Sequence, residues 1–117
     1  MASAIPDLKV TTHKEGSVTV VRCVGRIDAA THSIFDAKLK QLFTSGHYNL
    51  ILDLSEVGFV SSPGARAIIA ALAKSEDNNG QIVFLNPTPN VSALFNLIGL
   101  SELISVTKDL SEAMAQF

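Results

Sequence analysis

Strand-like and helix-like segments alternate along almost the whole chain, and this alternation constrains the fold more than any other feature. Apolar residues at every second position, or in continuous runs, predict strands over 8–14, 18–24, 48–54, 81–85 and 103–106. Apolar residues at steps of three and four predict helices over about 31–43, 65–74, 91–98 and 110–117. Because strands that alternate with helices form parallel crossovers, the sequence predicts an α/β fold with a mixed, mostly parallel sheet.

Turn residues mark the expected ends of these segments. Glu15-Gly16-Ser17 predicts a hairpin between the first two strands, which would be the antiparallel part of the sheet. We expect Gly25 to close the second strand and Asp28 to follow on the way out. Gly46 and Gly99 are suited to left-handed caps at the ends of helices. Thr31 or Ser33 could cap the start of the first helix.

Composition sets limits on the class of protein. The 117 residues fit one domain over 1–117, with about the first seven residues as a loose N-terminal tail. Hydrophobic residues make up 47%, and the formal net charge is -2 without a basic cluster. The sequence thus predicts a folded chain that does not bind nucleic acid. No segment approaches the roughly 18 to 20 apolar residues of a membrane span, and the residues before the first strand lack the basic and apolar segments of a secretory signal, so we expect none.

Cys23 is the only cysteine, so it cannot form an internal disulfide, and its strand-like context predicts a buried structural thiol. A chain without disulfides is typical of a reducing compartment, so we expect a cytoplasmic protein. The three histidines lie in separate segments without metal-ligand spacing. Neither a Gly-x-Ser-x-Gly elbow nor a Walker loop is present, so we expect no enzyme, cofactor or metal.

The stretch from Phe59 to Arg66 holds the candidate site, because two hydroxyls, a proline and a glycine stand at the start of a helix. Proline is tolerated at the first helical position, which would make Ser62 the N-cap, its hydroxyl accepting from the amide of Gly64 or Ala65. Gly64 lets a partner or a phosphate approach the backbone. A phosphate on Ser62 would face free amides and the positive end of the helix dipole.

A purely structural interpretation stays open for each of these residues. Ser62 could only cap the helix while Ser61 satisfies the loop. Asp28 could be a helix-entry carboxylate, and Arg66 a solvated helix charge, or both could contact a partner. We expect Asp53 to end the central strand and to anchor the loop through backbone amides.

Three segments together resemble the STAS-domain family of bacterial anti-sigma factor antagonists, over about 10–114. Gly25-Arg26-Ile27-Asp28 resembles a family turn, and Leu52 through Gly64 resembles the strand and the loop that follows it. Leu94 through Leu100 resembles the family's Leu-Phe-x-x-x-Gly-Leu helix end. The resemblance implies one STAS-like domain with about four helices packed largely on one face of the sheet.

The resemblance also implies a partner-switching mechanism. Ser62 matches a serine that a kinase, itself an anti-sigma factor, phosphorylates in this family, and a phosphatase resets the cycle. The implied contact surface is Asp28, Ser61, Ser62, Pro63, Gly64 and Arg66, with Lys74 a weaker candidate. Two positions depart from the family pattern, because Ser61 replaces the loop aspartate and Pro63 replaces the second hydroxyl residue. We expect a monomer or a weak dimer.

Two other functions stay open at this stage. The chain could be a STAS module that docks on a transporter ATPase or another signalling protein and is never phosphorylated. It could also bind a small molecule or a nucleotide at the same helix N-terminus.

Overall fold

A hairpin and three parallel pairings build the sheet. The computed structural model describes residues 7–117, and its strands are β1 (Leu8–Glu15), β2 (Val18–Ile27), β3 (Asn49–Val60), β4 (Gln81–Leu85) and β5 (Ser105–Thr107). β1 and β2 are antiparallel, the later neighbours are parallel, and the order in space is β1-β2-β3-β4-β5. Gly16 forms the tight hairpin turn with φ of 64°. The expectation of a mixed, mostly parallel sheet is confirmed.

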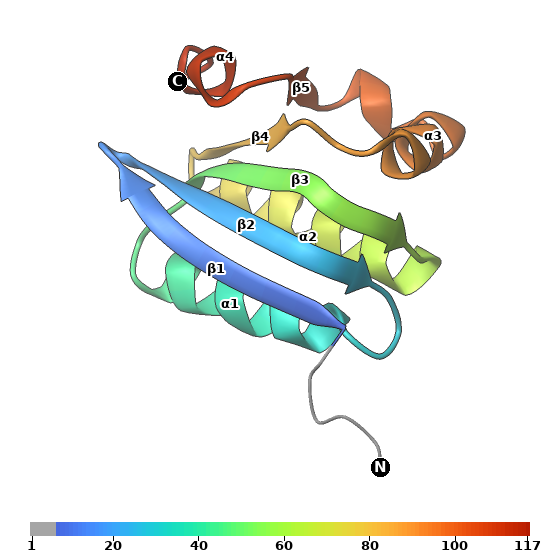
Figure 1. Ribbon diagram of the computed structural model, residues 1–117. Helices are drawn as coiled ribbons and strands as arrows, with labels where there is room; N and C mark the ends of the chain where they lie inside the picture. Colours follow the sequence, from blue (N-terminus) through green and yellow to red (C-terminus); the bar gives the residue numbers. More distant parts are fainter. Residues whose placement is uncertain (1–6) are drawn as a thin grey trace.

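The helices are divided unequally between the two faces of the sheet (Figure 1). They are α1 (His32–Thr44), α2 (Ser62–Asp77), α3 (Pro89–Leu97), the short 3-10 helix η1 (Leu100–Glu102) and α4 (Leu110–Met114). Buried residues of α1, α2 and α3 share one large core, whereas α4 covers a smaller cluster on the opposite face. The expected four helices, packed largely on one face, are therefore present. No helix within residues 7–117 combines the length and apolar character that crossing a bilayer requires.

Alternation along the inner strands separates the two cores. Leu50 and Leu52 of β3 belong to the large core, and Ile51 between them points into the smaller one. On the large-core side, Phe84 of β4 meets Phe95 of α3 edge to face, with ring centroids 5.5 Å apart. Because β3 is apolar on both faces, it needs cover from both sides, as expected for a central strand.

The second and third strands run further than the sequence predicted. β2 continues through Gly25 to Ile27, and β3 continues six residues past Leu54, to Val60. The register between these strands shifts twice, at Arg22/Val24 and at Gly25/Arg26, each time with an extra residue on β3. Such β-bulges bend a strand and turn its end, so they carry the end of β3 to the end of β2.

Several helix ends also differ from the predicted positions. α2 begins at Ser62 rather than at Ala65, and it ends at Asp77 rather than near Lys74. The last strand is Ser105–Thr107 rather than 103–106, because Leu103 is still the C-cap residue of η1. Gly46 and Gly99 have φ of 82° and 77°, so their predicted left-handed conformation is confirmed.

Asp7, the last residue of the expected N-terminal tail, contacts the end of β2. The expected N-terminal tail covers about seven residues, of which the first six lie outside the described residues. The seventh, Asp7, accepts a hydrogen bond from the backbone N–H of Arg26 at 2.8 Å and also pairs with the Arg26 side chain. Asp7 is therefore attached to the end of β2.

Gly64 allows the first turn of α2 to lie against the end of β2. A Cβ atom at this position would stand 2.0 Å from the carbonyl oxygen of Ile27, which is backbone and cannot rotate away. Gly64 itself is buried. The glycine is therefore required by close approach rather than by an unusual backbone angle.

We expect Gly64→Ala to destabilise the fold by roughly 1–3 kcal/mol, because the added methyl group forces α2 and β2 apart. Gly58→Ala is the matched control, since an added Cβ there meets nothing within 4 Å. We expect the control to stay within about 0.5 kcal/mol of the wild type. Urea unfolding followed by circular dichroism measures both, and equal stabilities of the two variants would contradict the close contact.

Candidate functional site

The ends of β2 and β3 bring the predicted site residues together. Ile27 pairs with Val60, and the backbone N–H of Ser61 donates to the carbonyl oxygen of Ile27 at 3.0 Å. Asp28 follows Ile27, and Ser62 follows Ser61, so both segments leave the sheet at the same edge. In parallel sheets this carboxyl edge is where ligands and partners are usually bound.

Ser61, not Ser62, caps α2, which corrects the sequence prediction. Ser61 has the extended backbone of an N-cap (φ -85°, ψ 176°), and its Oγ accepts from the N–H of Gly64 at 3.2 Å. Ser62 and Pro63 are then the first two residues of the helix. The Ser62 side chain is exposed and makes no hydrogen bond with any of residues 7–117. Its hydroxyl is thus available for chemistry without loss of the cap.

The shifted cap changes what surrounds the Ser62 hydroxyl. The N–H of Gly64 already donates to Ser61, and Pro63 has no N–H. The N–H of Ala65 donates to the carbonyl oxygen of Ser61 at 2.8 Å. A phosphate on Ser62 would therefore find fewer free amides than the sequence predicted. The positive end of the α2 dipole is the main favourable backbone interaction that remains for it.

Asp28 organises the connection between β2 and α1. Its Oδ1 accepts from the N–H groups of Ala30 and Thr31, both at 3.0 Å, and lies 3.1 Å from the Thr31 hydroxyl. Partial desolvation acts to raise the pKa of Asp28. The Thr31 hydroxyl, the two amides and Arg26 outweigh that effect and hold the pKa below its ordinary value. The helix-entry interpretation of Asp28 fits these bonds.

Thr31 supports the same turn from the other side. It is the N-cap residue of α1, as one of the two sequence alternatives had it, but its side chain makes no capping bond. Instead its Oγ1 donates to the carbonyl oxygen of Arg26 at 2.7 Å and accepts from the N–H of Asp28 at 3.0 Å. The Thr31 side chain therefore stabilises the end of β2 rather than the first turn of α1.

Arg66 lies one helical turn after Ser62 and is exposed. Together with Pro63 of α2 and His32 and Asp36 of α1, it lines a shallow hollow of about 450 Å³. His32 Nδ1 is 2.8 Å from Asp36 Oδ2. No pattern in the sequence marks His32 or Asp36 as site residues, because only the packing of α1 beside α2 places them here.

An apolar surface adjoins the loop on its other side. Phe59 is 48% exposed and Leu97 is 83% exposed, and both line a hollow of about 270 Å³ between β3 and α3. Thr88 and Asn90 hold α3 in place by donating to the carbonyl oxygens of Val57 and Gly58. Phe59 was missed as a site residue, although an aromatic residue directly before the loop was a visible signal.

Other residues that the sequence singled out lie away from this edge. Asp53 is inside β3 rather than at its end, and its Oδ1 accepts from the N–H and hydroxyl of Ser55. Lys74 is about 18 Å further along α2 than Ser62, at about 1.5 Å per residue. Cys23 is buried as predicted; burial, and then the nearby Asp53, raises the pKa of its thiol to about 12. Within residues 7–117, no cluster of His, Cys, Asp and Glu could hold a metal ion.

Comparison with known proteins gives one family. The family model described as STAS domain matches residues 9–113. BtrV of Bordetella bronchiseptica, a protein named as an anti-sigma factor antagonist, is 23% identical over 110 residues, covering 94% of this chain and 95% of its own.

Solved structures support the same fold. An anti-sigma factor antagonist from Mycobacterium paratuberculosis superposes with a TM-score of 0.85 at 23% identity, covering 97% of both chains. The antagonist SpoIIAA superposes in its unphosphorylated form with a TM-score of 0.79 at 21% identity, over 92% of this chain and 95% of that one. The phosphorylated form of SpoIIAA, from Bacillus, gives 0.73 at 20% identity, over 92% and 98%. At sequence identities of 20–23%, the structural similarity shows the fold alone.

The two serines should respond differently to replacement. We expect Ser61→Ala to cost about 1 kcal/mol of stability, because the Gly64 amide loses its acceptor. Ser62→Ala should change stability by less than about 0.5 kcal/mol, because its side chain is exposed and makes no bond within the described residues. Thermal or urea unfolding compares them. A larger loss of stability for Ser62→Ala than for Ser61→Ala would indicate that Ser62, and not Ser61, caps α2.

Asp28 should make stability depend on acid. A carboxyl whose pKa is lower in the folded state stabilises the protein above its unfolded pKa, about 3.9, and loses that contribution as pH falls through the folded pKa. We therefore expect wild type to exceed Asp28→Asn in melting temperature above about pH 5, and the gap to shrink toward pH 2. Asp77→Asn is the control, because its side chain has no hydrogen bond or salt bridge with residues 7–117. A gap that does not change with pH would contradict the role of charge at Asp28.

Proposed function

The chain belongs to the STAS domain family, and from that premise we propose that it is an anti-sigma factor antagonist controlled by phosphorylation of Ser62. Without the phosphate it binds an anti-sigma factor that is also a serine kinase. With the phosphate it releases that kinase, and a phosphatase restores the first state. In this scheme the chain is the substrate of an enzyme and is not itself a catalyst. The observation that carries the proposal is the exposed Ser62 hydroxyl at the start of α2, beside a cap made by Ser61.

Access is the first requirement for phosphorylation, and the geometry supports it. The Ser62 side chain is exposed, and it stands at the carboxyl edge of the sheet rather than between two packed layers. A kinase must bring the hydroxyl within reach of its nucleotide, which an exposed helix start allows. Pro63 stiffens the backbone directly after the acceptor, so the loop meets the kinase in one conformation.

Retention of the fold is the second requirement. Ser61 caps the helix, so a phosphate on Ser62 takes no acceptor away from the backbone. The phosphate adds roughly -1.5 to -2 charges near the positive end of the α2 dipole. Arg66 is four residues further on and so faces the same side of the helix, where its guanidinium can pair with the phosphate. Phosphorylation would therefore alter the surface and leave the fold intact.

Release of the partner follows from what surrounds the new charge. The proposed contact surface is Asp28, Ser61, Ser62, Pro63, Gly64 and Arg66, with the exposed Phe59 and Leu97 as an apolar flank. A partner that fits Phe59 must remove water from the surface beside Ser62. A hydrated dianion in that position opposes the desolvation, which lowers the affinity.

Purified chain should take up a single phosphate from an anti-sigma factor kinase of the same genome and ATP. We expect mass spectrometry to place the phosphate on Ser62, and Ser62→Ala to take up none while it still binds the kinase. The phosphorylated chain should bind the kinase about 100-fold more weakly, and Ser62→Asp should weaken binding in the same direction. Ser61→Ala is the control, because it removes the neighbouring hydroxyl and keeps the acceptor.

Three outcomes would contradict this function. A phosphate on Ser61 would contradict the assignment of Ser62 as the acceptor. A chain that binds a partner and takes up no phosphate would favour a STAS module that docks without being modified. Equal affinities of the phosphorylated and unmodified chains for the kinase would remove the switch, even if Ser62 is the acceptor.

A further inference from the structure

A shallow hollow of about 270 Å³ lies between the end of β3 and α3, directly before the Ser62 loop. Within residues 7–117 its lining is uncharged and consists of Phe59, Val60, Asn90, Ala93, Leu94 and Leu97. Phe59 is 48% exposed and Leu97 is 83% exposed, and Ala93 is exposed as well. The hollow is therefore open to solvent, and its rim is apolar.

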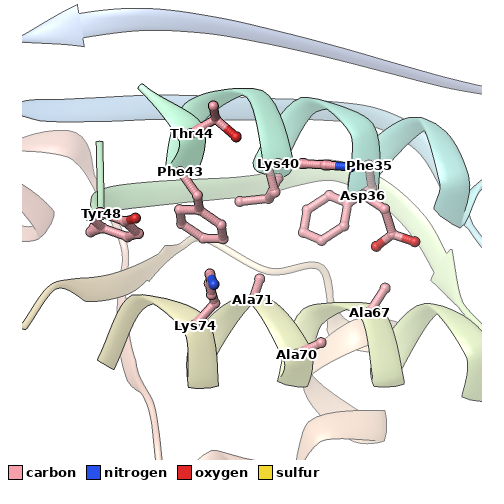
Figure 2. Close-up of a pocket in the computed structure, with 11 residues that line it drawn as sticks. Phe35, Asp36, Lys40, Phe43, Thr44, Tyr48, Ala67, Ala70, Ala71 and Lys74 are labelled. Carbon is pink, nitrogen blue, oxygen red and sulfur yellow. The ribbon is translucent and has the colours of Figure 1, made fainter. Parts of the chain in front are cut away.

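The larger cavity between α1 and α2 has walls of a different kind (Figure 2). Phe35, Leu39 and Phe43 line it, but they are 8% exposed or less and belong to the large core. Their apolar surface is already covered by the chain itself, so a partner would gain little from it. Beside Phe59, by contrast, apolar area remains that a partner can remove from water.

Two hydrogen bonds attach α3 to the strand that carries Phe59, and Figure 1 shows α3 beside the second half of β3. The Thr88 hydroxyl donates to the carbonyl oxygen of Val57 at 2.7 Å. The Asn90 side-chain amide donates to the carbonyl oxygen of Gly58 at 3.2 Å. Both sides of the hollow are therefore held in place before a partner arrives, which lowers the ordering cost of binding.

Size, charge and position together select the occupant. Small-molecule sites commonly enclose about 300–1,000 Å³ and cover most of their ligand, whereas this hollow is smaller and open. It suits one side chain that a protein surface presents. An apolar side chain is favoured, because a charged one would lose water and meet no opposite charge in the lining. Phe59 stands three residues before Ser62, so a protein seated here also reaches the Ser62 loop.

We propose that the anti-sigma factor places one apolar side chain in this hollow, and that Phe59 and Leu97 supply much of the affinity for it. This inference rests on the proposed function, and it separates the residues that bind the partner from the hydroxyl that releases it. A few apolar anchors seated in pockets commonly dominate the energy of a protein interface. Phe59 and Leu97 are the rim residues that such an anchor would cover.

Binding of the unmodified chain to the anti-sigma factor kinase, measured by calorimetry without ATP, tests these two residues. Leu97→Ala should raise the Kd about tenfold or more and leave the fold unchanged, because the side chain is 83% exposed. Leu103→Ala is the matched control, because Leu103 is 78% exposed and lines no part of the hollow. The control should bind within about twofold of the wild type.

A second pair of variants fills the hollow instead of trimming its rim. Ala93→Leu adds a larger side chain at an exposed lining position and should weaken kinase binding about tenfold or more. Ala115→Leu makes the same change at the exposed C-cap of α4, outside the hollow, and should bind as the wild type does.

Methyl NMR spectra of the leucine-labelled chain report the contact directly. In the complex, we expect the Leu97 methyl groups to shift and to show intermolecular nuclear Overhauser effects to the kinase. The Leu103 methyl groups should show neither change.

The possible outcomes separate this inference from the proposed function. If the phosphate on Ser62 weakens kinase binding but Leu97→Ala and Ala93→Leu bind as the wild type does, this inference is wrong and the proposed function stands. If no anti-sigma factor kinase of the same genome binds the chain, both are wrong. Self-association of the chain that Leu97→Ala abolishes, with unchanged kinase affinity, would assign the hollow to a second copy and overturn the inference.

Discussion

The carbonyl oxygen of Ile27 is the point on which the candidate site depends. It accepts from the N–H of Ser61, and the Cα of Gly64 packs against it so closely that no side chain fits between. This contact joins the end of β2 to the start of α2, and β2 leads directly into Asp28. The positions of Asp28, the Ser62 hydroxyl and Arg66 relative to one another follow from it. A carbonyl oxygen is well suited to this task, because it is held by its own strand and has two lone pairs.

The local pattern of apolar residues was enough to predict the helices and strands, but not the length of the strands that carry the site. Apolar spacing predicted the five strands and the four α-helices of residues 7–117, but not the 3-10 helix η1. The second half of β3 contains Ser55, Glu56 and Gly58, which interrupt the apolar run at which the sequence prediction stopped. That half is a strand because it pairs with β2 through two bulges, and such pairing depends on residues some thirty positions away. No local pattern contains that information.

The candidate loop could be found from residue types, whereas the roles of its two serines could not. Proline is tolerated in either of the first two helical positions, since neither amide has an acceptor within the helix. The sequence is therefore compatible with a cap at Ser61 or at Ser62. The hydrogen bond from Ser61 to Ile27 decides between them, because it fixes Ser61 in the extended conformation that a cap requires. His32 was missed for a similar reason, because the packing of α1 beside α2 brings it to the hollow next to Pro63.

Separate roles for the two serines have a consequence for regulation. If one hydroxyl were both cap and phosphate acceptor, each phosphorylation would change the start of α2 as well as its charge. With the cap on Ser61, a phosphate on Ser62 in the proposed switch would leave the start of α2 at the same residue and would act only on what docks there.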